Sequence, residues 1–183
     1  AYHRDIFQVL RQVKHRFDRQ AQFAADADGV HNAGGMSEEG YELLDEMIRL
    51  NMQIDLAHLP LKTQQQVYQH VARHHKYYPL FNSHPRMDPL LRNNEKKFLK
   101  EFVTTPETLA YVRETGGVLG LRTGEDPMLS YNGSGKNPVV ANNCDGSIRS
   151  WLQFYQYADD RGVKLAFASD FNEIEPIRVW MDF

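Results

Sequence analysis

The sequence predicts an α/β fold in which parallel strands alternate with helices. The main observation is that four segments with helical spacing are each followed at once by a short apolar run. Because a crossover helix returns the chain to the same edge before the next strand begins, repeated helix–strand units favour a parallel sheet. With 183 residues, 42% of them hydrophobic, the chain is expected to form a single α/β domain over residues 1–183.

The first helix–strand unit covers residues 37–60. We expect a helix over residues 37–50, with acidic residues near its N-terminus, where the helix dipole favours them. Residues 52–57 form a short apolar-rich run that predicts a strand, and Pro60 discourages its continuation, so His58 begins a loop. The apolar face of the helix carries Tyr41, Leu44, Met47 and Ile48.

The second and third units repeat this pattern. A Gln-rich helix is expected over residues 63–76, followed by a brief strand over 78–83 that leads to His84. Thr105 and Pro106 are typical of a capping residue and the first helical position of the next helix. Gly116 and Gly117 end that helix before a strand over residues 118–121.

The fourth unit ends at an acidic residue. Ser147 is expected to cap a helix that stops near Gly162, and the strand over residues 164–169 then leads to Asp170. The aromatic residues of this helix are expected in the core because they recur at helical spacing: Trp151, Phe154 and Tyr155.

Two segments lack clear periodicity. Residues 1–35 are interpreted as an irregular or helical lead-in to the domain. Residues 123–145 contain glycine, proline and asparagine and predict a long connection of the kind that often forms a lid or binding loop.

Composition makes some function classes unfavourable. The net charge of −3 and the scattered basic residues give no stripe suited to a nucleic-acid backbone. No run approaches the roughly 18 apolar residues needed to span a bilayer, and the first residues do not resemble a signal peptide. Cys144 is the single cysteine and has no internal disulfide partner, which leaves the compartment open.

Three potential metal ligands each follow a predicted strand: His58, His84 and Asp170. The carboxyl ends of parallel strands share one edge of a sheet, so we expect these side chains to lie close together. Two imidazoles and a carboxylate suit zinc or a similar divalent ion, which lowers the pKa of a bound water to about 7. The pattern therefore predicts a metal-dependent hydrolase.

Each of these residues also has a simpler interpretation than metal binding. A histidine after a strand is commonly a polar loop residue, and Asp170 has the alternative of bonding a backbone amide. His70 and His74 also have metal-ligand spacing on their helix, but no glutamate lies between them, and a solvated helix face is the favoured interpretation.

Several short motifs occur together in a fixed order. They are Ile54 to His58, Asn82 to His84, Arg92–Asn93, Gly116 to Val118, and Ala168 to Asn172. In this order the chain resembles membrane (renal-type) dipeptidases of the amidohydrolase superfamily over about residues 36–172.

This resemblance implies a (β/α)8 TIM barrel with a two-zinc site that hydrolyses dipeptides. It implies that His58 and His84 hold one metal, and that Asp170 holds or faces the other and accepts a proton. It also implies that Arg92 pairs with the substrate carboxylate and that His15 and Asn172 contact the substrate.

The chain departs from the family pattern at its N-terminal side. A complete barrel needs about 250 residues, so the chain is interpreted as a C-terminal portion, an incomplete barrel. The first-strand His-x-Asp pair and the bridging glutamate of the family have no equivalent that follows a strand, which puts the second metal in doubt. His3-Arg4-Asp5 has the spacing of the pair but leads into an amphipathic run with no strand before it, and is interpreted as a coincidence. Uncovered sheet edges predict a homo-oligomer or association with the missing half of the barrel.

The leading hypothesis is a zinc metallopeptidase that cleaves the peptide (amide) bond of a small peptide-like substrate by metal-bound hydroxide. Two alternatives remain open at this point. The first is another amidohydrolase activity, such as ester or lactone hydrolysis. The second is a catalytically silent structural or binding fragment of the fold.

Overall fold

The computed structural model describes residues 23–26, 29–32, 34–91, 103–122, 129–134, 140–141 and 148–168. Its helices are α2 (Glu38–Arg49), α3 (Leu61–His74), α5 (Pro106–Glu114) and α6 (Ile148–Asp159), with a short 3-10 helix η1 (Asp88–Leu90). Its strands are β1 (Phe23–Asp26), β2 (Gly29–Asn32), β3 (Ile54–Asp55), β4 (Leu80–Asn82), β5 (Val118–Arg122), β6 (Leu129–Ser130), β7 (Val140–Ala141) and β8 (Lys164–Ala168).

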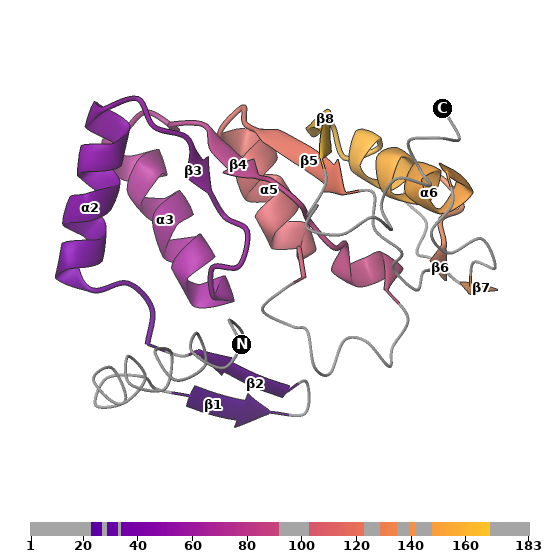
Figure 1. Cartoon of the computed structure of the whole chain (residues 1–183), viewed down its shortest axis with the longest axis horizontal. Helices are drawn as coiled ribbons and strands as arrows, with labels where there is room; N and C mark the ends of the chain where they lie inside the picture. Colours follow the sequence, from indigo (N-terminus) through magenta and orange to yellow (C-terminus); the bar gives the residue numbers. More distant parts are fainter. Residues whose placement is uncertain are drawn as a thin grey trace, which may run out of the picture.

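The centre of the fold is a four-stranded parallel sheet with the order β3-β4-β5-β8 (Figure 1). Every neighbouring pair is parallel, and the spatial order is the order along the chain. The predicted parallel α/β class with helix–strand units is therefore confirmed. The four described strands form an open sheet with β3 and β8 at its edges.

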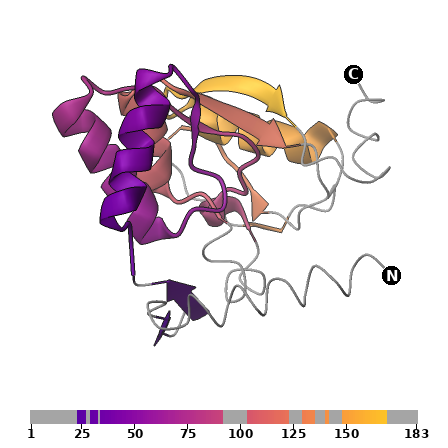
Figure 2. The same ribbon diagram turned by 60° about the vertical axis from the view of Figure 1, so that its left-hand side comes forward.

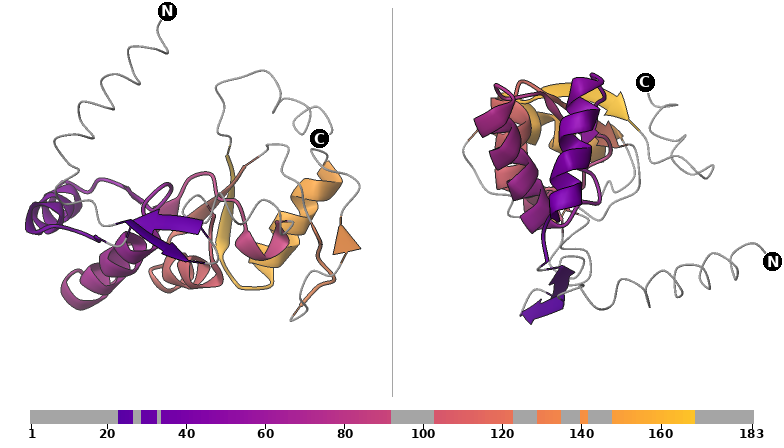
Figure 3. Two further views of the ribbon diagram at one scale, coloured as in Figure 1. Left: turned by 90° about the horizontal axis from the view of Figure 1, so that it is seen from below. Right: turned by 90° about the vertical axis from the view of Figure 1, so that its left-hand side faces the viewer.

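Helices α3, α5 and α6 connect successive strands of this sheet. Figure 2 shows β5 and β8 side by side with α6 against one face of the pair, and the right-hand view of Figure 3 looks onto α2 and α3, which lie next to each other. The apolar side chains between the helices and the sheet form one core, which includes Leu44, Ile54, Leu80, Val112, Leu119, Phe154 and Tyr157.

Capping residues fix where two helices begin. The Ser37 hydroxyl accepts a hydrogen bond from the Gly40 amide at 3.2 Å, and the Thr105 hydroxyl accepts one from the Thr108 amide at 3.3 Å. These bonds satisfy amides that have no partner within the helix. Helix α3 begins at Leu61, two residues before the predicted start, directly after Pro60.

The expectation that Tyr155 lies in the core is wrong. Its side chain is 41% exposed, whereas Tyr157 is buried in its place. The buried face of α6 runs through Trp151, Phe154 and Ala158, and a residue next to Phe154 lies about 100° around the helix from it. Tyr155 instead stacks on Trp151, with ring centroids 5.8 Å apart.

Both segments expected to be irregular contain paired strands. β1 and β2 pair antiparallel, with Phe23 opposite Asn32 and Asp26 opposite Gly29, and form a sheet of their own. The Asp28–Gly29 dipeptide is a general turn signal and was available in the sequence, although Gly29 itself belongs to β2. In the long connection, β6 and β7 also pair antiparallel.

Two glycines in and before β5 allow unusually close approach of backbone. A Cβ atom at Gly117 would lie 1.7 Å from the carbonyl oxygen of Leu80, and one at Gly120 would lie 2.2 Å from that of Ser83. Strands β4 and β5, together with the loop after β4, therefore pack closer than any side chain at these positions would permit.

The outer edge of the sheet at β8 is only partly covered. Phe167 is 47% exposed, although its ring stacks on that of Trp151 with centroids 4.7 Å apart. Across the described ranges, no helix is long and apolar enough to cross a membrane.

Candidate metal centre

His58 lies in a tight turn directly after β3. The Leu59 amide donates to the carbonyl oxygen of Leu56 at 3.2 Å, which closes the turn. His58 has φ of +61°, a left-handed conformation that glycine or asparagine usually adopts at this position of a turn. Backbone strain of this kind persists only where the surroundings enforce it, and it concentrates at functional sites.

His84 follows β4 by two residues and is partly buried. Its Nδ1 atom lies 2.6 Å from the hydroxyl oxygen of Ser83, so the neighbouring residue fixes the orientation of the ring. The opposite ring nitrogen, Nε2, then points away from Ser83 and toward the loop after β3. A bonded Nδ1 with an outward Nε2 is the usual arrangement of a metal-binding histidine.

The structure brings His58 and His84 together, although 26 residues separate them in the chain. Their Nε2 atoms are 2.6 Å apart, and their ring centroids are 4.6 Å apart with an angle of 50° between the planes. The two rings thus present the same nitrogen to one point at the carboxyl ends of two adjacent parallel strands.

Asp55 ties the two histidine loops to each other. One carboxylate oxygen, Oδ1, accepts hydrogen bonds from the Ala57 amide at 2.9 Å and from the Ser83 amide at 3.1 Å. Each of these amides belongs to the residue immediately before a histidine. Sequence reasoning missed Asp55, and the available signal was a carboxylate at the end of an otherwise apolar strand.

A buried glutamine holds the far side of the His58 turn. The Gln64 side-chain amide donates to the Leu59 carbonyl at 2.7 Å, and its oxygen accepts from the Thr108 hydroxyl at 2.7 Å. Both Gln64 and Thr108 are buried. Because buried polar groups lose stability when unpaired, this network fixes the turn relative to α3 and α5.

The donor set at His58 and His84 fits a divalent metal ion. Two nitrogen ligands of tetrahedral zinc, each about 2.0–2.1 Å from the ion, stand about 3.3 Å apart. A small separation of the two rings would therefore admit an ion between their Nε2 atoms. In the tautomer that carries its proton on Nδ1, His84 would offer its Nε2 lone pair to such an ion.

The other predicted site residues lie outside the described part of the chain. These are the metal ligand and catalytic residue Asp170 and the substrate-binding residues Arg92, His15 and Asn172. Strand β8 ends at Ala168, two residues before Asp170.

A second group of ligand-type side chains lies between α2 and α3. Oδ1 of Asp45 is 2.5 Å from Nε2 of His70 and 2.6 Å from Nε2 of His75. The hydrogen bond from His70 is the main cause that lowers the pKa of Asp45 below its ordinary value. The favoured interpretation of a solvated histidine face is therefore wrong for His70, because its partner comes from another helix, whereas His74 is exposed.

Comparison with solved structures finds a metallopeptidase called dipeptidase AC, of peptidase family M19, with 23% sequence identity and a TM-score of 0.55. The likeness covers 75% of this chain and 36% of that chain. A metallopeptidase from Rhodobacter sphaeroides, solved with a phosphinate mimic of the dipeptide L-Ala-D-Ala, has 18% identity and a TM-score of 0.49, over 75% of this chain and 34% of that chain.

The likeness to dipeptidase AC shows a shared fold over three quarters of the chain. The chain spans about a third of the length of the two metallopeptidases. No family model and no curated protein matches the sequence. The resemblance carried by the ordered motifs thus recurs at the level of structure.

Proposed function

We propose that the chain is part of a metal-dependent hydrolase that cleaves the peptide (amide) bond of a small, dipeptide-like substrate. The observation that carries this proposal is the convergence of His58 and His84, whose Nε2 atoms are 2.6 Å apart at the carboxyl ends of β3 and β4. The shared fold with a metallopeptidase described as a dipeptidase supports the same conclusion.

His58 and His84 would hold the ion through their Nε2 atoms, and we propose zinc because imidazole ligands suit it. A zinc ion bound there supplies Lewis acidity, which polarises a carbonyl and acidifies bound water. The chain's own residues position the ligands: Asp55 holds both loops by their amides, and the Ser83 hydroxyl, 2.6 Å from Nδ1, orients the ring of His84.

Asp170 is proposed as the third ligand and as the proton acceptor of the reaction. Its support is topological: it follows β8, which pairs in parallel with β5, and the carboxyl ends of parallel strands share one edge. We further propose that Arg92 binds the substrate carboxylate through two parallel hydrogen bonds, and that His15 and Asn172 contact the substrate.

We also propose that the chain forms part of a (β/α)8 barrel and associates with further strands through β8. Two observations support this: the partial exposure of Phe167 at that edge, and the 36% of dipeptidase AC over which the likeness extends. An open strand edge with exposed apolar side chains favours pairing with another chain or segment.

The proposal is tested first by metal content. The chain loaded with zinc is compared with His58→Asn and His84→Gln, and bound metal is measured by elemental analysis after dialysis. We expect both variants to lose the equivalent of zinc that this centre holds. Asparagine is chosen at position 58 because it tolerates the left-handed backbone there, so loss of metal is separated from loss of fold.

His74→Gln is the matched control, since it removes an exposed histidine outside this centre. The proposal is wrong if His58→Asn and His84→Gln bind as much zinc as the control. Dipeptide, ester and lactone substrates offered to the zinc-loaded chain then distinguish the reaction. Amide hydrolysis is expected, ester or lactone hydrolysis would assign another substrate class, and no turnover would indicate a silent fragment.

A further inference from the structure

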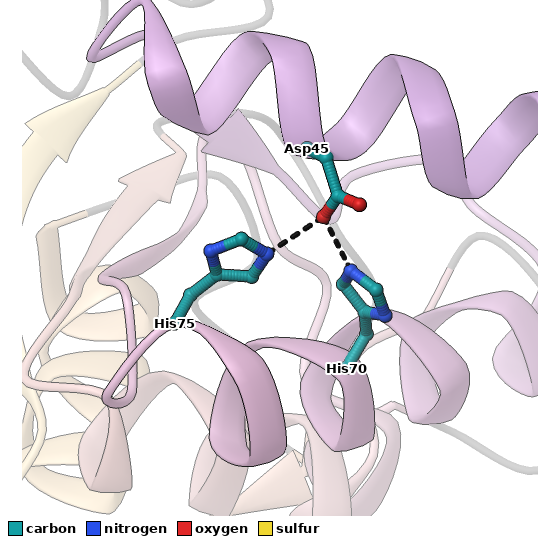
Figure 4. Close-up of side chains that lie close together, drawn as sticks. All are labelled: Asp45, His70 and His75. Atoms are coloured by element: carbon teal, nitrogen blue, oxygen red, sulfur yellow. Dashed lines mark hydrogen bonds and ion pairs between the residues drawn. The ribbon is translucent and has the colours of Figure 1, made fainter.

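The group formed by Asp45, His70 and His75 joins two helices on the outside of the fold (Figure 4). Asp45 comes from α2 and His70 from α3, and His75 is the capping residue directly after α3. These side chains lie on or next to helices, whereas His58 and His84 belong to loops at the carboxyl ends of strands. The group is thus a separate feature of the molecule.

The three side chains converge on one point. Both histidines direct Nε2 at the same carboxylate oxygen, Oδ1 of Asp45, at 2.5 Å for His70 and 2.6 Å for His75. One ligand atom from each residue lies within 4.8 Å of the other two. Ligand atoms on a tetrahedral zinc ion stand about 3.3 Å apart, so a small opening of the group would admit an ion.

The backbone at the end of α3 holds His75 in place. The His75 amide donates to the Val71 carbonyl at 3.0 Å, so His75 is fixed to the last turn of α3. Lys76 and Tyr77 follow with φ of +53° and +59°, two successive left-handed residues that are not glycine. Such backbone is strained and persists only when the surrounding structure over-determines it.

The burial of the group suits a bound ion. The side chains of His70 and His75 are 15% and 22% exposed, whereas that of Asp45 is 49% exposed. The imidazole rings are therefore shielded and held in place, and the ring of Tyr41 lies 5.1 Å from that of His70. The carboxylate side stays open, so an ion can enter and complete its coordination with water.

We propose that Asp45, His70 and His75 form a second zinc-binding site, which fastens α2 to α3. Two imidazoles and a carboxylate are a borderline donor set that suits zinc better than calcium or magnesium, which prefer oxygen ligands. The hydrogen bonds require a proton on each Nε2 atom. Zinc takes the place of these protons when each ring carries its proton on Nδ1 instead.

The site has a consequence for stability because its ligands come from two helices. An ion bound only by the folded chain stabilises it by mass action, and the effect grows with the concentration of the ion. We expect the thermal unfolding midpoint to rise with added zinc. This rise depends on all three ligands and is independent of the proposed hydrolase centre.

The test uses the full chain with His58→Asn and His84→Gln combined, which silences the other centre. Zinc is titrated into this background by calorimetry, and we expect one equivalent to bind. Adding Asp45→Asn or His75→Gln should abolish that equivalent and the zinc-dependent rise in unfolding midpoint. Glu42→Gln in the same background, which neutralises an exposed acid of α2 outside the group, is the control and should leave both unchanged.

The proposal is overturned if the background binds no zinc, or if it binds zinc equally well with Asp45→Asn and with His75→Gln. His75 lies beyond the helix end and is partly exposed, so its replacement by glutamine is not expected to unfold the chain, and circular dichroism checks this. Failure of the hydrolase proposal would give a different result. The unmutated chain and the chain with His58→Asn and His84→Gln would then bind the same number of zinc equivalents.

Discussion

The glycine pair before β5 gives a sharp test of how closely the strands pack. In Gly117→Ala, the new Cβ atom would lie 1.7 Å from the Leu80 carbonyl oxygen and 2.7 Å from its carbon. Contacts with backbone this short never persist, so β4 or β5 must move by more than an ångström. Leu80 is held by its pairing with Ile54 in β3 and by a 3.1 Å hydrogen bond from its amide to the Thr115 hydroxyl.

We expect Gly117→Ala to lower the free energy of unfolding by about 3–5 kcal/mol, above the usual range for overpacking, because backbone rather than a side chain must give way. Gly116→Ala is the matched neighbour. A Cβ atom there meets nothing closer than Lys164 Nζ at 4.0 Å, so the cost comes only from its φ of +69°. That left-handed strain amounts to about 1–2 kcal/mol.

The measurement is urea unfolding of the chain and both variants, followed by circular dichroism, with the slope of the transition checked for change. The reasoning fails if Gly117→Ala loses no more stability than Gly116→Ala. In that case the strands would yield easily at this contact, and the close approach of β4 and β5 would not be a fixed property of the fold.

Two further predictions concern hydrogen bonds. Asp55→Ala removes the acceptor shared by the two histidine loops and should weaken zinc binding at His58 and His84 by about 10–100-fold. Asp55→Asn keeps an oxygen there and should bind zinc nearly as the unmutated chain does. Equal zinc affinities of Asp55→Ala and the unmutated chain, measured by calorimetry, would contradict this. The hydrogen bond from Tyr68 to Glu114 raises the pKa of Tyr68 to about 12, so its stabilising effect is present below the ordinary pKa of 10 and is lost as pH rises through about 12. Glu114→Gln should lower that pKa, and an unchanged tyrosinate absorbance titration would refute the assignment.

The sequence was sufficient for the features that depend on local chemistry. Thr105 caps its helix as expected, because a capping hydroxyl acts on an amide three residues away. The parallel order of the sheet followed from the alternation of helices and strands. His58 and His84 were selected as neighbours for a related reason, since parallel strands end at the same edge.

The features that the sequence did not predict depend on long-range pairing. Asp55 gains its role from the Ser83 amide, 28 residues away, and His70 gains its partner from Asp45 on another helix. Helical spacing indicated which aromatic residues of α6 could be buried. Whether Tyr155 or Tyr157 is the buried one depends on how the helix is rotated against the sheet. Such choices are settled by packing between elements.

The order of the strands along the sheet has a geometric consequence for its two faces. Each crossover advances in the same direction, and crossovers between parallel strands are almost always right-handed, so α3, α5 and α6 fall on one side. The opposite side carries Asp55, Gly120 and Ala166, which the strand register places on the same face. In the barrel proposed above, this second face is the one that would turn inward as further strands are added, so the direction in which the chain travels would define which surface lines the packed interior.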